Sequence, residues 1–411
     1  MKKNILVLTP IYPSEDGVKG STPVVHYFVK EWQKLGYNVV VINSKATYPP
    51  IFYNLPKPIY KYVEKYFGVA VSRNAPRTNK EYIYEGIKVK RFCIKKIMPR
   101  MDYTFKDIKK HFDEISSYLK RIKFKPDYIL GHWDSPTLLL IPFLRKSFQN
   151  SIISVVTHGI PYISINKGVN KYSEALQYLD VIGFRSASSM KRFNELFPNV
   201  NKKKFVCYSG VPDSFIKEMS NRQLNKDFSK DVWNFIYVGL LIDRKYPDLV
   251  LEALINTESK NPFKFTIIGE GAVGDKIKQI AIRNNVRDNV SLLGRLPRNL
   301  VVDSMAKAQC FIMISRNEAF GLVYLEAMLA GCIVIASRNE GIDGIIIDGY
   351  NGFLCEAGNM SELEGVILKV RSMSISKLEE ISGNAIETAS KYSDSFVAKE
   401  YLSHIEFSNN F

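Results

Sequence analysis

The segment CFIMISRNEAFGLVYLEAM, residues Cys310–Met328, decides the fold class of this 411-residue chain. Its first five residues form a short apolar run that is typical of a buried strand, and the residues from Phe320 onward open a helix. Strand and helix patterns alternate in the same way along the rest of the chain. Such alternation indicates an α/β protein, and this length predicts about two domains.

Two successive series of strands and helices are expected. We predict two doubly wound Rossmann-like domains, 1–215 and 216–391, with ligands in a cleft at the carboxyl ends of their strands. Residues 45–100 are rich in Pro and Tyr, which predicts a long irregular insertion. Residues 210–231 are predicted to form the linker between the two domains. The expected strands are 5–8, 38–42, 128–130, 152–156, 181–184, 205–208, 234–238, 263–268, 290–293, 310–314 and 333–336. The expected helices are 23–35, 107–122, 248–255, 275–284, 300–306 and 320–330.

Composition indicates a cytoplasmic globular enzyme. Hydrophobic residues make up 46% and charged residues 24% of the chain. Five cysteines, an odd number without a CxxC pair, argue against a disulfide framework or a zinc site. The apolar run Ile5–Leu8 is shorter than a signal peptide needs, and no run approaches the ~18 residues of a membrane span.

Positive charge is concentrated in the first half of the chain. The net charge is +16, but residues 1–230 hold 39 Lys and Arg against 18 Asp and Glu, whereas residues 231–411 hold 18 against 23. Lysines alternate with aromatic residues in the most basic stretch, 45–130. This surface suits an anionic membrane, or alternatively nucleic acid, and an ordinary solvated lysine-rich face remains open. We expect a peripheral association with the inner face of the plasma membrane.

The strongest candidate site lies between Glu318 and Glu326. Gly321 permits close approach of the backbone to a ligand, and the unpaired amides of the following helical turn favour a diphosphate. Glu326 can accept hydrogen bonds from a ribose diol, and Glu318 from the hydroxyls of a sugar. Both residues could instead be ordinary helix carboxylates. However, a charge within the apolar stretch around Glu326 normally has a partner.

The pattern Glu318-x7-Glu326 with Phe-Gly-Leu-Val between its glutamates resembles the donor site of the GT-B retaining glycosyltransferases called family 4 or group 1. The resemblance spans nearly the whole chain, and its specificity comes from the order of many weak motifs. These are Pro13–Pro23, Asp127–Trp133, Thr157–Gly159, Tyr208–Asp213, Val238-Gly239 before Lys245, Ile268–Gly271, Leu293–Arg295 and Asp348–Leu354.

The resemblance implies a role for each matching residue. Glu318 would hold the donor sugar, Glu326 the ribose, and Lys245 the departing diphosphate. His158 would lie beside the reacting sugar, with His132 as a weaker candidate that is also explained as a packed or capping histidine. The remaining donor-binding residues would be Gly20, Gly239, Arg295, Leu296, Phe320, Gly321, Leu322 and Val323.

One position departs from the family. Members often have Arg directly after the glycine that corresponds to Gly239, whereas this chain has Leu240. Arg244, next to Lys245, is a candidate for the missing cation, and the alternative is an exposed loop charge. The helix 392–411 is expected, from the resemblance, to pack back on the first domain.

These features predict a retaining glycosyltransferase that needs no metal or other cofactor. The sequence has no Asp-x-Asp pair, so cations and helix N-termini would stabilise the leaving diphosphate. The resemblance implies same-face attack by the acceptor, and the first domain is the acceptor side. We expect a nucleoside-diphosphate sugar as donor and a glycan or polyprenyl-linked saccharide as acceptor, in bacterial surface polysaccharide synthesis. No nucleic acid partner is expected.

Three alternatives remain open at this stage. A degenerate GT-B protein could use its basic first domain to bind a membrane or nucleic acid. An oxidoreductase could use the GxGxxG pattern Gly269–Gly274, although that pattern does not follow the first strand of either domain. An inverting transferase or a sugar-nucleotide epimerase could share the same architecture.

Overall fold

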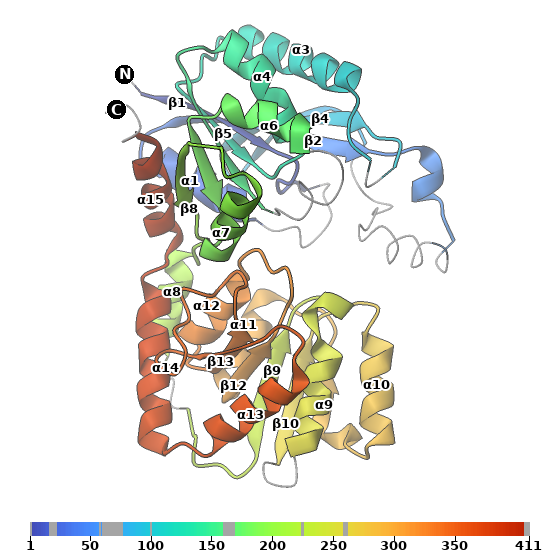
Figure 1. The fold of residues 1–411 in the computed structure, drawn as a ribbon, viewed down its shortest axis with the longest axis vertical. Coiled ribbons are helices and arrows are strands. Elements are labelled where there is room, and N and C mark those ends of the chain that lie inside the picture. Colours follow the sequence, from blue (N-terminus) through green and yellow to red (C-terminus); the bar gives the residue numbers. More distant parts are fainter. Residues whose placement is uncertain are drawn as a thin grey trace. The chain divides into compact units, whose positions relative to one another are not determined.

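The computed structural model describes residues 2–15, 23–56, 59, 77–98, 101–158, 169–222, 226–257 and 262–406 (Figure 1). The chain forms two compact units. The first contains Met1–Arg185, Met190–Cys207 and Val397–Phe411, and the second contains Ser186–Ser189 and Tyr208–Phe396. Each unit has a largely parallel sheet of its own, so the predicted α/β class with two Rossmann-like sheets is confirmed.

The first unit is built on an eight-stranded sheet in the order β3-β4-β2-β1-β5-β6-β7-β8. All neighbouring strands are parallel except β3 and β4. The strands are β1 (Asn4–Thr9), β2 (Asn38–Thr47), β3 (Lys80–Tyr84), β4 (Ile87–Lys95), β5 (Tyr128–His132), β6 (Ile152–Thr157), β7 (Val181–Phe184) and β8 (Lys203–Val206). The helices are α1 (Val24–Lys34), η1 (Pro50–Tyr53), α3 (Phe105–Arg121), α4 (Thr137–Ser147), α6 (Val169–Gln177), α7 (Ala187–Leu196) and α15 (Asp394–Glu406).

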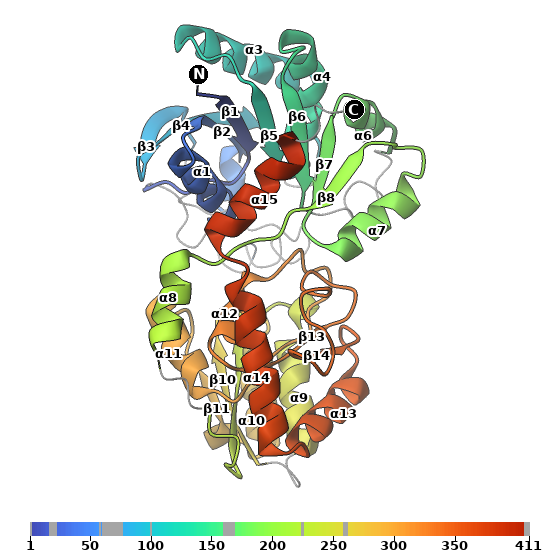
Figure 2. The ribbon, with the colours of Figure 1, turned by 90° about the vertical axis from the view of Figure 1, so that its left-hand side faces the viewer.

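Helices cover both faces of this sheet (Figure 2). Helices α3, α4 and α6 pack beside one another on one face, and α1 and α15 lie together on the other. The indole nitrogen of Trp32 in α1 donates a hydrogen bond to the carbonyl of Ala398 in α15, at 3.0 Å. The ring of Tyr401 lies 5.2 Å from that of Trp32 and 5.5 Å from that of Phe28. The last helix therefore completes the core of the first unit.

The expectation that residues 45–100 are an irregular insertion is wrong for part of this stretch. Strand β4 pairs in parallel with β2 inside the sheet, and β3 joins β4 through a two-residue hairpin turn. The turn residues Glu85 and Gly86 have φ of 44° and 80°, as a type I′ turn requires. In β4, buried Ile87 and Val89 alternate with lysines, which is the period of a half-buried strand. Residues 57, 58 and 60–76 lie outside the described part of the chain.

The second unit is built on a six-stranded sheet in the order β11-β10-β9-β12-β13-β14. Its strands are all parallel: β9 (Trp233–Val238), β10 (Phe263–Ile268), β11 (Val290–Leu292), β12 (Cys310–Met313), β13 (Ile333–Ser337) and β14 (Phe353–Cys355). Its helices are α8 (Asp213–Asn221), η2 (Asp243–Lys245), α9 (Pro247–Thr257), α10 (Gly274–Arg283), η3 (Arg287–Asn289), α11 (Arg298–Lys307), α12 (Leu322–Leu329), α13 (Met360–Arg371) and α14 (Ile375–Ser390). Helix α8 lies within the stretch 210–231 that was expected to be a linker.

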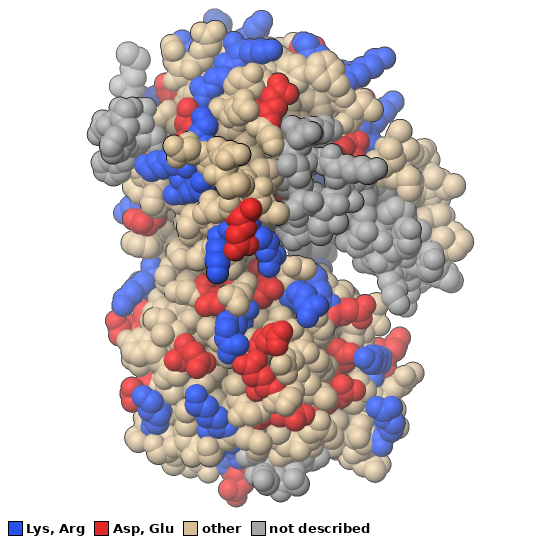
Figure 3. Space-filling view, in the orientation of Figure 1, with Lys and Arg blue, Asp and Glu red and all other residues tan. Residues whose placement is uncertain are grey.

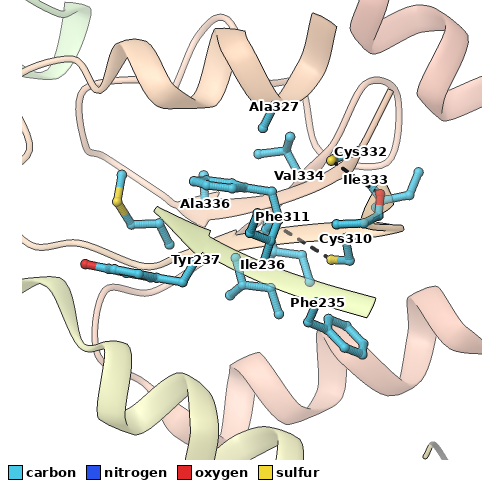
Figure 4. Packing of buried hydrophobic residues seen from close by; sticks show 14 of the residues in the cluster. Phe235, Ile236, Tyr237, Cys310, Phe311, Ala327, Cys332, Ile333, Val334 and Ala336 are labelled. Atoms are coloured by element: carbon cyan, nitrogen blue, oxygen red, sulfur yellow. Dashed lines mark hydrogen bonds between the residues drawn. The ribbon is translucent and has the colours of Figure 1, made fainter. Parts of the chain in front are cut away.

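The strands of the second unit are apolar because both faces of the sheet are covered. Helices α9, α10 and α13 lie on one face, and α11, α12 and α14 on the other. Figure 4 shows the centre of this core, where side chains of β9, β12 and β13 pack with Ala327 of α12. Local signals fix the helix starts, since Asn359 and Ser374 accept hydrogen bonds from first-turn amides of α13 and α14.

The GxGxxG pattern after β10 has a structural explanation. A Cβ on Gly269 would lie 1.8 Å from the carbonyl oxygen of Gly239, and one on Gly271 would lie 2.2 Å from that of Leu241. Both glycines have positive φ beyond 140°. These two positions therefore need glycine because the loop after β9 passes directly against them.

We predict that α15 contributes strongly to stability through Tyr401. Replacing fully buried Tyr401 with Ala should cost about 3–5 kcal/mol, because a large cavity would open between α1 and α15. Exposed Lys399 on the same helix is the matched control, and Lys399→Ala should change stability by less than about 0.5 kcal/mol. Thermal and urea unfolding of both variants test this. Equal midpoints for the two variants would show that α15 does not complete the core.

Candidate active site

In the second unit, the predicted residues gather where the strand order reverses. Strand β9 has β10 on one side and β12 on the other, so the carboxyl ends of β9 and β12 form a topological switch point. Gly239 follows β9, and the loop that contains Glu318 follows β12. The sulfur of Met313, the last residue of β12, lies 3.8 Å from Lys245 Nζ and 3.6 Å from the position of a Cβ on Gly239. The fold therefore brings Gly239, Lys245 and the Glu318 loop together.

The central contact of this site is an ion pair between Lys245 and Glu318. Lys245 Nζ lies 2.9 Å from Glu318 Oε2, and both side chains are only 12% exposed. The two residues come from different connections, η2 and the loop after β12. Glu318 Oε2 is buried, and Lys245 is its ion-pair partner at this distance, whereas no other hydrogen bond to this oxygen is found among the described residues. A ligand hydroxyl can therefore still donate to this oxygen.

Arg244 belongs to the same cluster, at a more exposed position. Its Nη1 lies 3.8 Å from Glu318 Oε2 and donates hydrogen bonds to the carbonyls of Arg316 and Asn317, at 3.2 and 3.3 Å. Its side chain is 43% exposed. Leu240 occupies the position of the family arginine and contributes no positive charge to the site. Arg244 thus places a second positive charge beside Glu318 while it holds the loop before it.

Gly321 opens helix α12 in a left-handed conformation, with φ of +81°. A Cβ at this position would lie 2.5 Å from the ring of Tyr324, whose hydroxyl donates to the carbonyl of Met313 at 2.7 Å. Among the described residues, no side chain caps this helix N-terminus. The amides of Leu322 and Val323 therefore present the positive end of the helix next to the Lys245–Glu318 pair.

A loop after β13 supports the Glu318 loop, and sequence reasoning missed it. The amide of Glu318 donates to Glu340 Oε2 at 2.8 Å. A Cβ on Gly341 would lie 2.4 Å from the backbone nitrogen of Phe320, so only glycine fits there. Phe320 itself is buried. The pair Glu340-Gly341, which begins three residues after the end of β13, was the available signal, because loops beyond strand ends often carry functional residues.

Glu326 has the partner that its apolar surroundings predicted. Arg298 at the start of α11 places Nη2 2.7 Å from Glu326 Oε1. Burial raises the pKa of Glu326, and the positive charge of Arg298 opposes that shift. Exposed Arg295 and half-buried Leu296 lie in the loop just before Arg298. The ion pair therefore connects α12 to the loop that carries these two predicted donor contacts.

The remaining predicted residues belong to the first unit. Gly20 lies outside the described residues. His158 follows β6, and its Nε2 lies 3.2 Å from Nδ1 of His132 at the end of β5. The ring of Trp133 stacks on His158 with a centroid distance of 4.0 Å and an interplanar angle of 19°. His132 lies at the switch point between β1 and β5, since β1 has β2 on its other side, and His158 lies at the end of the next strand, β6.

The histidine pair is held in its neutral form. Burial lowers the pKa of His132 to about 3 and that of His158 well below its usual value, and the nearby guanidinium of Arg185 lowers both further. Neutral imidazoles can donate and accept hydrogen bonds at neutral pH. Arg185 is itself buried and donates to the carbonyl of Cys207 at 2.7 Å.

Asp134 is a further polar residue in this cluster that sequence reasoning missed. Burial raises its pKa to about 7, and its Oδ1 accepts no hydrogen bond from the described residues. Arg185 directly follows β7, and Asp134 lies two residues after His132, the last residue of β5. That position was the signal by which they could have been found.

The described residues hold neither a metal-binding cluster nor a membrane-spanning helix. Over those residues no group of three or more His, Cys, Asp and Glu is arranged to hold a metal ion. No helix in the same part of the chain has both the length and the apolar character needed to span a bilayer.

Comparison with known proteins identifies the class. Residues 220–388 match the family "Glycosyl transferases group 1". The chain is 32% identical over 178 residues to the uncharacterized glycosyltransferase MJ1178 of Methanocaldococcus jannaschii. The aligned region covers 43% of this chain and 46% of that protein. It is 26% identical over 224 residues to N-acetyl-alpha-D-glucosaminyl L-malate synthase of Bacillus anthracis, covering 53% and 58%. The chain thus spans about half the length of these curated relatives.

Structural comparison agrees with the sequence matches. An Escherichia coli trehalose-6-phosphate protein bound with UDP-2-fluoro glucose superposes with a TM-score of 0.71 at 12% identity, over 98% of this chain and 99% of the other. This similarity shows the GT-B fold. The family match over residues 220–388 and the similarity of fold together support a GT-B glycosyltransferase of group 1.

We predict that Glu340 holds the Glu318 loop in place. Glu340→Ala removes the acceptor of a charge-assisted hydrogen bond, so exchange of the Glu318 amide should accelerate about 10- to 100-fold. Glu340→Gln keeps an acceptor oxygen and should show a smaller effect. Hydrogen exchange of the peptide that contains residues 316–321 measures this. Glu380→Ala, at an exposed pair with Lys377, is the control. Unchanged exchange in Glu340→Ala would contradict the assignment.

We also predict that the stability contribution of Arg298 depends on pH. In Arg298→Ala the buried Glu326 loses its cation, so its folded-state pKa rises further above the unfolded value of about 4.3. An acid with a raised folded pKa destabilises the fold as pH rises through that range. The variant should lose about 1–2 kcal/mol at pH 7.5 and less at pH 5.

The double variant Arg298→Ala/Glu326→Gln separates charge from packing. It should recover most of the lost stability at pH 7.5 and show no change in the defect between pH 5 and 7.5. Thermal unfolding at both pH values gives the comparison. A defect in Arg298→Ala that is equal at both pH values would mean that Arg298 acts through its packing on the ring of Phe215, at 4.9 Å, and not through Glu326.

Proposed function

We propose that the chain is a retaining, metal-independent glycosyltransferase that uses a nucleoside-diphosphate sugar. The observation that carries the proposal is the Lys245–Glu318 ion pair at the uncapped N-terminus of α12. A lysine, an arginine and a helix N-terminus at one place are suited to a dianionic leaving group. The adjacent buried carboxylate is suited to sugar hydroxyls. The names of the relatives support a sugar transfer.

In the proposed reaction, the bond between the anomeric carbon and the diphosphate oxygen breaks as the acceptor oxygen attacks from the same face. The acceptor proton passes to the departing diphosphate. Lys245 and the amides of Leu322 and Val323 stabilise the negative charge that develops on that group. Glu318 accepts hydrogen bonds from the sugar and so fixes its orientation. Arg244 adds a second cation beside the site, which would offset the loss at Leu240.

His158 and Glu326 would orient the donor. Because burial keeps the His158 ring neutral, it can contact a sugar hydroxyl without adding charge near the reacting carbon. The stacking of Trp133 and the contact with His132 fix the plane of that ring. Glu326 would accept from the ribose, with Arg298 maintaining its ionised form. We further propose a glycan or polyprenyl-linked saccharide as acceptor, in the synthesis of a bacterial surface polysaccharide.

The test is a thermal-shift screen of the full chain against UDP, GDP, ADP, CMP and NAD, each with and without EDTA. One nucleoside diphosphate should raise the midpoint, and the shift should survive EDTA. At about 100-fold its dissociation constant a ligand adds about 2.7 kcal/mol, which is easily detected. A shift only with NAD, or a shift abolished by EDTA, would overturn the proposal. No shift with any nucleotide would favour a non-catalytic binding protein.

Two variants and a product analysis complete the test. Lys245→Ala should weaken binding of the nucleotide found in the screen by about 10-fold or more, since a partly buried cation at a diphosphate is lost. Lys278→Ala, a lysine 62% exposed on α10, should leave the affinity unchanged. The anomeric configuration of the product, measured by NMR, should match that of the donor. An inverted product would disprove the retaining mechanism.

A further inference from the structure

The segment that leads from β4 into α3 exposes three large apolar side chains. Ile97 is 63%, Met101 45% and Phe105 75% exposed. They stand four residues apart, within nine residues of sequence. One side of Phe105 rests on the ring of Phe143, with a centroid distance of 5.6 Å, and its other side is open. Exposed apolar side chains so close together usually mark a contact surface.

Basic side chains surround these apolar residues. Lys95 lies two residues before Ile97, at the end of β4. Lys106, Lys109 and Lys110 lie in the first turns of α3, and all four lysines are exposed. The last three, with Lys90 and Arg121, line a groove of about 730 Å³ between α3 and β4. Lys109 and Lys110 pair with Asp113 and Glu114 at 2.5 and 4.0 Å. Exposed pairs of this kind are weak and exchange readily for another anion.

Residues 95–110 thus carry six basic and two acidic residues, with apolar side chains between them. Figure 3 shows Lys and Arg side chains projecting from the surface over α3, whereas Asp and Glu are frequent over the second unit. We call Lys95, Ile97, Met101, Phe105, Lys106, Lys109 and Lys110 the α3 surface. Its combination of lysines with isolated apolar side chains is that of proteins that bind the interface of an anionic bilayer.

Other occupants fit this surface less well. Nucleic acid would use aromatic rings as stacking platforms, but two of the three exposed apolar residues are aliphatic. A second copy of the chain would bring two sets of lysines together, and like charges oppose such a contact. The hydrocarbon boundary of a bilayer accepts both aliphatic and aromatic side chains, while headgroup phosphates neutralise the lysines. Charge complementarity therefore favours an anionic membrane.

We propose that the α3 surface docks the chain on an anionic lipid bilayer, with Ile97, Met101 and Phe105 entering the acyl boundary and the four lysines contacting headgroup phosphates. This docking does not depend on the proposed transferase activity. It would, however, bring the first unit to a membrane-embedded acceptor. The bound ligand class is a bilayer surface and not a soluble anion, because the apolar residues have no role with a free phosphate.

The test is co-sedimentation of the full chain with vesicles of phosphatidylcholine, with and without about 30% phosphatidylglycerol, at 100 mM salt. Binding should require the anionic lipid and should weaken at 500 mM salt. Ile97→Ser/Met101→Ser/Phe105→Ser and Lys106→Gln/Lys109→Gln/Lys110→Gln should each reduce the partition coefficient at least 10-fold, since one lysine near the surface contributes about fivefold. Inorganic phosphate at 10 mM should not displace the chain.

Matched variants in the second unit control for the loss of apolar area and charge. Exposed Ile282 and Ile347 replaced by Ser, and exposed Lys264, Lys278 and Lys307 replaced by Gln, should retain wild-type binding. All variants should keep the wild-type unfolding midpoint. Equal partition to both vesicle types, wild-type binding by either triple variant, or binding of duplex DNA but not vesicles would overturn the proposal.

A substitution that preserves the surface gives an independent measurement. Phe105→Trp places an indole at the most exposed of the three apolar positions. The chain has three tryptophans of its own, so the measured signal is the difference between variant and wild-type emission. This difference should shift to the blue with anionic vesicles and should be quenched by lipids brominated in the acyl chain. Emission that is unchanged while the protein sediments with vesicles would show that another surface makes the contact, and would overturn the assignment to α3.

Discussion

The ion pair between Lys245 and Glu318 is the contact on which the site of the second unit depends. Each side chain is largely buried, and a buried basic or acidic group is tolerated mainly when it has a partner of opposite charge. The pair joins η2 to the loop after β12, so it fixes two connections that meet at the switch point of the sheet. Neutralising one partner would leave the other side chain without its counter-ion in a poorly hydrated place. The positions of the two connections therefore depend on both charges being present.

The surrounding residues serve to hold that pair and the nearby helix N-terminus in one arrangement. Glu340 accepts the amide of Glu318, Gly341 contacts Phe320, and Tyr324 ties α12 to the end of β12. The first two contacts join connections that follow different strands, and the third holds α12 against the strand that precedes it. The geometry of the site therefore comes from rigid strand ends, while the chemistry comes from a few side chains placed on the loops beyond them.

Sequence reasoning located this site well because its main residues lie in one continuous strand-loop-helix segment. It found Glu318, Gly321 and Glu326 by pattern, but it missed Glu340 and Arg298, which reach the site from other connections. Contacts of that kind depend on the pairing of distant strands, which no local period reveals. Strand β4 was missed for a different reason: the Pro and Tyr content of its neighbourhood hid a clear alternation of buried and exposed residues. The short helix α8 was likewise concealed by a composition typical of linkers.

The return of the chain to its first unit has a consequence for synthesis. The core between α1 and α15 includes Trp32 and Tyr401, so the first unit cannot finish packing when its own sheet has left the ribosome. Translation of the intervening 208–396 takes about 10–40 s at ordinary elongation rates. During that interval the second unit can fold in full, while the buried face of α1 waits for the helix that will cover it. The part of the protein made first is thus completed last, and its exposed apolar face is a natural client for a chaperone.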